Sequence, residues 1–166
     1  MDRGAAPEDE AWLRFCVAAQ RFCDVIESVS EFSDADSFYA AIAEPLAVLY
    51  AAGLTLPWYP PSDDDIDIDG LGSGEWRALF TSINALTGND DPYRTVFDPH
   101  NDTDLVEAPL AGDLADVYRD VQPVTTWDDP DRLADLQFEV RSSFQGHWGR
   151  HAVEAMRAIH WRRGYW

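Results

Sequence analysis

The amino-acid sequence predicts an all-α fold, a single-domain bundle of about five helices over residues 1–166. In several long segments, apolar side chains recur at spacings of three and four residues, as on one face of a helix. Alternation of apolar and polar residues never extends beyond a few positions, so no strand is expected. Glycine and proline residues separate the apolar segments and mark the expected helix ends.

The first predicted helix covers about residues 9–30. Cys16 and Cys23 widen its apolar stripe, and with a rise of about 1.5 Å per residue they lie about 10 Å apart, too far for a disulfide. We therefore expect two reduced thiols. The stripe itself consists of Trp12, Phe15, Ala19, Phe22, Ile26 and Val29.

The second predicted helix covers about residues 35–52, with Pro45 expected to kink it and Gly53 to end it. An acidic loop over 57–72 follows, and Ser73 is expected to cap a third helix that Gly88 closes. The inward residues of the second helix are Phe38, Ile42, Leu46 and Leu49, and those of the third are Trp76, Leu79, Phe80, Ile83 and Leu86.

The connection over 88–109 is predicted to be irregular, and Asp113 is expected to cap the fourth helix, which Pro123 ends or bends. The last helix is predicted from about residue 130 to near 163, with a bend near Gly146 and Gly149. Its start is marked by an aspartate followed by a proline in the first helical position.

The charge of the chain is strongly negative. It holds 31 acidic against 12 basic residues, a net charge of −19, and every basic residue is arginine. The absence of lysine excludes Schiff-base chemistry at lysine and the lysine of a phosphate-binding P-loop. Such a surface repels nucleic acid and anionic lipid, so direct binding to either is not expected. A basic protein partner is compatible with it, and so is solubility alone.

Residues 140–166 reverse this charge balance, with five arginines against one glutamate. The terminal segment HWRRGYW mixes aromatic and arginine side chains, a composition found at interfaces. Packing of this segment back onto the bundle is an equal alternative. We expect no apolar segment near the ~20 residues of a membrane span, and the N-terminal segment lacks a signal-peptide core. These features predict a cytoplasmic protein.

The segment DDDIDIDGLGSGEW at 63–76 resembles the start of a calcium-binding loop, with Asp65, Asp67 and Asp69 at alternate positions before Gly70. The twelfth position, which should be a bidentate glutamate, is Trp76. The preceding WYPP also excludes an entering helix. A solvated acidic loop before the third helix is therefore expected instead of an ordered calcium site.

The last helix contains His147 and His151, four residues apart and hence on one helical face. Two histidines at this spacing form half of a zinc or iron site, and Asp116 and Asp120 of the fourth helix could add carboxylates. The metalloprotease motif fails, because Trp148 stands where the glutamate should be. A mixed histidine–aspartate metal site between two helices is one interpretation.

The preferred interpretation is a structural hub, a packing point where the last helix crosses the fourth. Glycine costs about 1 kcal/mol inside a helix, a cost offset if Gly146 and Gly149 let another backbone approach. The histidines would then donate hydrogen bonds to carboxylates of the fourth helix. The predicted hub consists of Asp113, Asp116, Tyr118, Arg119, Asp120, Gly146, His147, Trp148, Gly149, Arg150 and His151.

Four segments resemble a bacterial family of about this length, catalogued as domain of unknown function number 5063. The two most specific are LAGDLADVYRDV at 110–121 and HWGRHAVEAMRAIH at 147–160, supported by FCDVIE in the first helix and FDPH at 97–100. The resemblance covers essentially the whole chain, apart from the acidic loop at 63–69. It implies a small helical cytoplasmic protein and assigns no catalytic residue.

No complete catalytic motif is present, and no cofactor is expected. The charge therefore favours a non-enzymatic interaction module that docks on a basic protein partner. An inhibitor of a basic toxin or nuclease, or a mimic of nucleic-acid charge, is a concrete version. The alternative is a metal-dependent enzyme that uses His147, His151 and carboxylates of the fourth helix.

Overall fold

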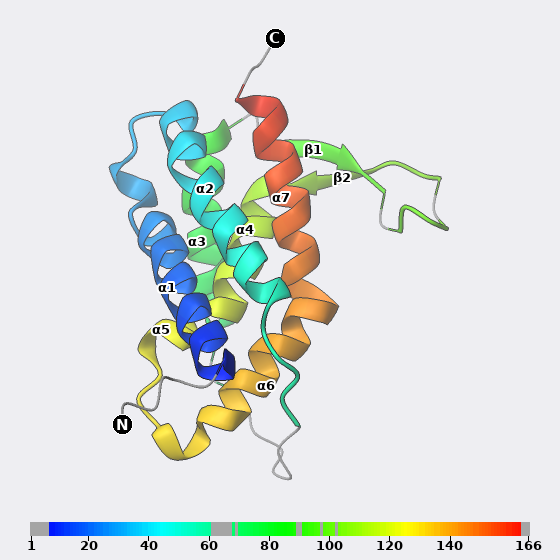
Figure 1. Ribbon diagram of the computed structural model, residues 1–166. Coiled ribbons are helices and arrows are strands. Elements are labelled where there is room, and N and C mark those ends of the chain that lie inside the picture. The colour runs from blue at the N-terminus through cyan, green and yellow to red at the C-terminus, as the bar shows by residue number, and fades with distance from the viewer. Residues whose placement is uncertain are drawn as a thin grey trace.

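Helices dominate the computed structural model, which describes residues 7–60, 68, 70–88, 91–96, 98–101 and 103–163. The predicted all-α class is confirmed (Figure 1). Within the described residues the helices are α1 (Pro7–Glu27), α2 (Ala35–Leu54), α3 (Ser73–Thr87), α4 (Leu110–Val121), α5 (Pro123–Thr126), α6 (Leu133–Ser143) and α7 (Gly149–Arg162). A π-helical turn, Phe144–Trp148, joins α6 to α7, and short 3₁₀ turns occupy Val29–Glu31 and Pro130–Arg132.

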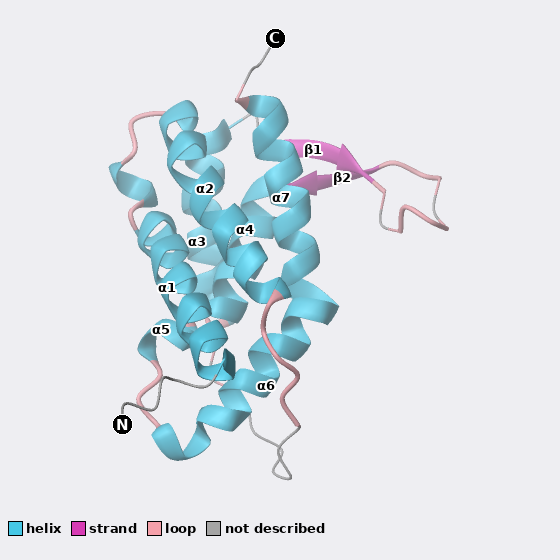
Figure 2. Cartoon of the chain, viewed as in Figure 1, coloured by secondary structure: helices cyan, strands magenta, loops and turns pink. Residues whose placement is uncertain are grey.

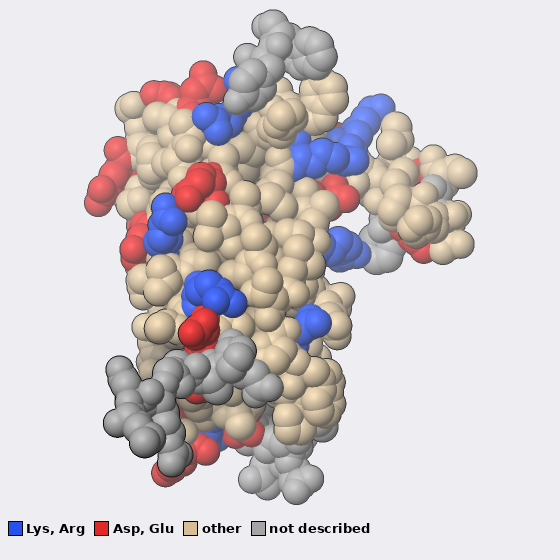
Figure 3. All heavy atoms as spheres, viewed as in Figure 1, with Lys and Arg blue, Asp and Glu red and all other residues tan. Residues whose placement is uncertain are grey.

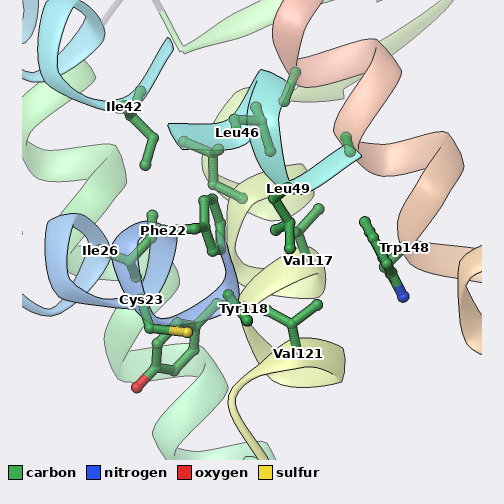
Figure 4. Packing of buried hydrophobic residues seen from close by; sticks show 14 of the residues in the cluster. Phe22, Cys23, Ile26, Ile42, Leu46, Leu49, Val117, Tyr118, Val121 and Trp148 are labelled. Carbon is green, nitrogen blue, oxygen red and sulfur yellow. The ribbon is translucent and has the colours of Figure 1, made fainter. Parts of the chain in front are cut away.

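The predicted apolar stripes of α1 and α2 face each other and form the core with α4 (Figure 4). Completely buried side chains include Phe22 and Ile26 of α1 and Leu46 of α2, and Val117 of α4 packs with them. Burying each such side chain stabilises the fold by about 1.5–3 kcal/mol. The spacing of three and four therefore identified the inward faces of these helices correctly.

Two helix starts differ from the prediction. The residue before α3 is Gly72, whose backbone N–H donates to Glu75 Oε2 at 3.1 Å, so Ser73 is inside the helix instead of capping it. Helix α4 begins at Leu110, which places Asp113 in the first turn. The first amides of α4 instead donate to Asp91, which lies far away in sequence: Leu110 N to its carbonyl at 3.1 Å and Ala111 N to its carboxylate at 2.7 Å.

The predicted irregular connection over 88–109 contains a β-hairpin, which corrects that prediction (Figure 2). Strand β1 (Pro92–Thr95) pairs antiparallel with β2 (Val106–Pro109), and the strands start and end on the opposed pair Pro92 and Pro109. Four-residue strands are too short to display a clear period of two. Asp91 fixes the hairpin against the helices, and burial raises the pKa of its carboxyl group.

The last predicted helix is divided by the π-helical turn, which occupies the predicted bend. A Cβ at Gly149 would collide with the carbonyl oxygen of Phe144 inside this turn, so glycine is needed there. The close approach is thus within the same helix and not between helices. Gly146 has no heavy atom within 4 Å of an added Cβ, so the predicted packing role of Gly146 is wrong.

Helix α2 passes Gly53 and continues to Leu54, so Gly53 is not its stop. An added Cβ at Gly53 would lie 2.8 Å from the ring of Trp148 and 2.9 Å from the ring of Phe144. The close helix packing that we expected at the last helix therefore depends on a glycine of α2. Pro45 lies inside α2 and is buried.

By length and composition α2 could cross a membrane, which contradicts our expectation that no segment comes near this composition. Its mean hydropathy is 1.4, and 44% of the tested window is buried inside the fold. A core helix of a soluble protein passes the same test. Here Phe38, Ile42 and Leu49 of α2 are completely buried against neighbouring helices.

Both cysteines are free thiols, as predicted. Burial raises the pKa of Cys16 to about 11, and burial together with nearby carboxylates raises that of Cys23 further. Because the thiolate is the reactive form, neither residue is activated at neutral pH. The aspartates of the proposed calcium loop, Asp65, Asp67 and Asp69, lie outside the described residues.

We predict that Gly53→Ala lowers the melting temperature, because the added methyl group must displace the buried ring of Trp148. Overpacking of this kind costs about 1–3 kcal/mol. Gly74→Ala is the control, since Gly74 lies in α3 with nothing within 4 Å of its added Cβ. Equal melting temperatures for the two variants would contradict the packing described here.

Candidate functional site

Polar side chains of α4 meet those of the π-helical turn and α7 along one contact between antiparallel segments. On α4, Asp113, Asp116 and Asp120 have spacings of three and four, which place them on one helical face. His147 lies in the π-helical turn and His151 in the first turn of α7. The structure therefore brings together the carboxylates and imidazoles that the sequence suggested as partners.

His151 is held at its Nδ1 atom by Asp113. The Nδ1 to Oδ1 distance is 2.7 Å, and the hydroxyl group of Tyr93 donates to the other oxygen of Asp113 at 2.5 Å. The side chain of Asp113 is only 8% exposed. Burial and the contact with Asp113 raise the pKa of Tyr93, so its hydroxyl group stays a donor at neutral pH.

His147 has an equivalent arrangement with Asp120. The distance from its Nδ1 to Asp120 Oδ2 is 2.7 Å, and the hydroxyl group of Ser143 donates to the same oxygen. The Nε2 atom of His147 lies 3.4 Å from Nη2 of Arg119. The two imidazole rings are 4.7 Å apart between centroids and meet edge to face.

These contacts determine which ring nitrogens are available. An ionised carboxylate only accepts hydrogen bonds, so each Nδ1 must carry a proton. In the neutral imidazole, Nε2 then has a lone pair, which at His147 faces Nη2 of Arg119. Nε2 of His151 lies 3.8 Å from Oδ2 of Asp116. His147, His151 and Asp116 each offer one ligand atom, and the three atoms lie within 4.8 Å of one another.

Asp116 lies at the centre of this polar cluster. Its Oδ1 accepts from Nε1 of Trp76 at 3.0 Å and from Nη2 of Arg119 at 3.0 Å. Arg119 also contacts Asp120 through Nε at 3.4 Å. One guanidinium group therefore partly balances two carboxylates. The Arg119 side chain is 36% exposed, and Arg119 and Asp120 line an adjacent cavity of about 370 Å³.

Five residues of the predicted hub lie apart from this cluster, and one of them is Gly149, whose close contact is with Phe144 of the π-helical turn. The hydroxyl group of Tyr118 donates to Glu27 at 2.8 Å, on the side facing α1. Trp148 is completely buried, and its Nε1 donates to a backbone carbonyl of α6 at 3.2 Å. Arg150 is exposed, and Gly146 makes no close packing contact.

Sequence reasoning did not assign Trp76, Tyr93 or Ser143 to the cluster. Trp76 and Tyr93 are 40 and 20 residues away from their aspartate partners, and no local pattern connects them. Ser143 had a usable signal, because it precedes His147 by four residues and thus shares its helical face.

We predict that Asp113→Ala destabilises the protein, because it leaves His151 Nδ1 and the Tyr93 hydroxyl group unpaired. The loss should be about 1–3 kcal/mol. In a double-mutant cycle with His151→Ala, the two losses should not add, since both changes remove one shared contact. Asp104→Ala, in an exposed loop, is the control and should melt like the parent. Additive losses would contradict the coupling.

Comparisons with known proteins identify the family and the fold. A family model described as "Domain of unknown function (DUF5063)" matches residues 7–163. No curated protein matches the chain. Among solved structures, the crystal structure of protein BF1032 from Bacteroides fragilis is similar, with a TM-score of 0.80 and 20% sequence identity over 95% of this chain and 94% of that chain. At this identity the likeness concerns the fold alone. From the family match over almost its whole length, the chain belongs to the DUF5063 family.

Proposed function

We propose that this protein binds a divalent transition-metal ion through Nε2 of His147, Nε2 of His151 and a carboxylate oxygen of Asp116. One observation carries the proposal: one ligand atom from each of the three side chains lies within 4.8 Å of the other two. A separate carboxylate holds each Nδ1, which leaves Nε2 as the ligand atom of each histidine. Histidine ligands in metal sites commonly donate their second ring N–H to a carboxylate, which orients the ring. Asp113 and Asp120 have that role here.

The donor set favours zinc or ferrous iron. Two imidazoles and one carboxylate suit both metals, whereas calcium and magnesium prefer oxygen ligands alone. A tetrahedral ion with bonds of about 2.1 Å spaces its ligands about 3.4 Å apart, so binding would draw the three side chains closer together. Three protein ligands leave a coordination position open, as in catalytic metal sites. This supports a metal-dependent enzyme as the class of activity.

Arg119 competes with the ion in this proposal. Its Nη2 atom is 3.0 Å from Asp116 and 3.4 Å from Nε2 of His147, so it contacts two of the three ligands. Two positive charges at such a separation repel each other. The guanidinium group must therefore leave these contacts when the ion binds, and the adjacent cavity gives it room.

In the experiment, protein treated with a chelator is titrated with Zn²⁺, and separately with Fe²⁺ in the absence of oxygen. Calorimetry measures the binding, and the melting temperature measures the gain in stability. An ion at 100 times its Kd should stabilise the fold by about 2.7 kcal/mol. His151→Ala should abolish this gain, and His100→Ala, in an exposed loop, should keep it. If neither Zn²⁺ nor Fe²⁺ binds to the parent protein, the proposal is refuted.

The same titration on Arg119→Gln tests the competition. Removing the positive charge should tighten metal binding, because the ligands no longer share Asp116 with a guanidinium group. Unchanged or weaker binding would show that Arg119 does not oppose the ion. We expect His151→Ala to lower the affinity for the metal ion and Arg119→Gln to raise it. A general loss of stability on mutation cannot produce both results.

A second candidate function is docking on a basic protein partner, favoured by the net charge of −19 and by an apolar groove between α1 and α2. The groove has a volume of about 550 Å³, and Leu13 and Val17 on its wall are 64% and 55% exposed. Exposed apolar surface of this kind is typical of interaction sites. Arg14 and Arg21 in the lining pair with Glu10 and Glu44. An amphipathic helix with an apolar face matches the groove, and basic flanks match the net charge of the chain.

A synthetic helical peptide with leucines on one face and lysines on the other is the probe for this candidate. Val17→Asp should weaken its binding, and Val153→Asp, at a 42% exposed position of α7, should not. Equal binding by both variants would show attraction by charge alone, without docking in the groove.

A further inference from the structure

The hydrogen bond between Trp76 and Asp116 connects α3 to the proposed metal site. Nε1 of Trp76 donates to Oδ1 of Asp116 at 3.0 Å, across 40 residues of sequence, and both side chains are partly buried. Helix α3 packs against α4 along this contact. The indole group therefore orients a proposed ligand, although it comes from a helix that provides none of the three ligands.

Two features hold the indole ring of Trp76 in place. The ring stacks on that of Phe80, one helical turn later, with centroids 5.4 Å apart and planes 15° apart. The backbone N–H of Trp76 donates to the carbonyl oxygen of Gly72 at 2.9 Å, at the start of α3. A side chain that is fixed by its own packing can hold its hydrogen-bond partner in one orientation.

The two carboxylate oxygens of Asp116 have different surroundings. Oδ1 accepts from Nε1 of Trp76 and from Nη2 of Arg119, each at 3.0 Å. Oδ2 lies 3.8 Å from Nε2 of His151, and among the residues that the structure describes it has no hydrogen-bond donor. The oxygen that faces the histidine is therefore the one available to an ion.

Trp76 and Arg119 share Oδ1, but only Trp76 can stay there when an ion binds. The guanidinium group is positively charged, so a divalent cation repels it. The indole N–H is neutral and only donates, so it neither repels the ion nor competes as a ligand. Once Arg119 has moved away, Trp76 still holds Oδ1, and Oδ2 stays directed toward His151.

We propose that Trp76 is a positioning residue that limits Asp116 to one ligand oxygen and thereby raises the selectivity of the site for zinc over manganese. This role rests on the metal site proposed above. Two imidazoles and one carboxylate oxygen leave room for the tetrahedral geometry of Zn²⁺. A carboxylate that binds through both oxygens adds an oxygen ligand, which favours Mn²⁺ because that ion prefers octahedral, oxygen-rich sites.

The first test compares two affinities in each protein. Chelator-treated parent and Trp76→Phe are titrated with Zn²⁺ and with Mn²⁺ in a calorimeter. Trp76→Phe keeps a ring to stack on Phe80 and removes the N–H donor. The affinity for Zn²⁺ should fall about tenfold, as is usual when a group that orients a ligand is lost. The affinity for Mn²⁺ should change little, since the released oxygen offers it another ligand.

The ratio of the two affinities is the deciding quantity. Most sites with nitrogen ligands bind Zn²⁺ more tightly than Mn²⁺, so the preference of the parent alone proves nothing about Trp76. A general loss of stability weakens both ions alike and leaves the ratio unchanged. The fall of the ratio in Trp76→Phe therefore reports the orientation of Asp116.

Binding of divalent ions to the acidic surface has to be separated from binding at the site. The chain has 31 acidic residues, and Figure 3 shows acidic side chains at several separate places on one face. The titrations therefore contain excess Mg²⁺, which occupies exposed carboxylates. Trp58→Phe is the matched control, because Trp58 is 73% exposed, and it should leave both affinities unchanged.

The second test measures the coordination of the ion with Co²⁺, which substitutes for Zn²⁺ and absorbs visible light more strongly in tetrahedral than in octahedral sites. The parent saturated with Co²⁺ should show a strong band. Trp76→Phe at saturation should show a weaker one, because Asp116 then adds its second oxygen. Weaker binding by itself would change the amount of Co²⁺ needed for saturation and not the intensity reached there.

The outcomes distinguish failure of this role from failure of the metal site. If neither Zn²⁺ nor Fe²⁺ binds to the parent, both proposals are refuted. If the parent binds Fe²⁺ but not Zn²⁺, the metal site stands and the role of Trp76 in zinc selectivity is overturned. The role is also overturned if Trp76→Phe keeps the affinity ratio and the Co²⁺ band of the parent, or if Trp58→Phe shows the same losses.

Discussion

The contact between α4 and α7 is the constraint on which the rest of the arrangement depends. Helix α4 is buried along most of its length, from Leu110 through Ala115 and again at Val117 and Val121. Its carboxylates therefore lie where water is scarce, and an unpaired carboxylate there is costly. Histidines from the facing segment remove that cost by donating through Nδ1, at Asp113 and at Asp120. The pairing also specifies how far one helix is shifted along the other.

The π-helical turn between α6 and α7 makes this pairing compatible with the apolar core. It places His147 toward α4 while Trp148, the next residue, packs into the core against Phe15 and Phe144. π-helical turns occur often at functional sites, because they change the direction of side chains within a continuous helix. Gly149 permits the turn, since any larger residue would meet the carbonyl oxygen of Phe144. The same short segment thus determines both the packing of the core and the position of His147 in the polar cluster.

The hairpin also supports the polar cluster. Its start is fixed by Asp91, which accepts from the first amides of α4, and Tyr93 of β1 reaches Asp113. A shift of the hairpin would therefore alter the support of His151 through Asp113. The segment with the least sequence signal for regular structure therefore contributes to the candidate site.

The sequence by itself determined the all-α class, the inward faces of the long helices and the matching of acids on α4 with histidines near α7. These features follow from local periodicity, because a helix projects residues three and four apart onto one face. Tertiary structure decided the remainder. Trp76 and Tyr93 complete the cluster across 40 and 20 residues, Gly53 packs on Trp148, and Asp91 caps α4. Such contacts join segments far apart in the chain, so no local pattern encodes them and only the folded packing brings them together.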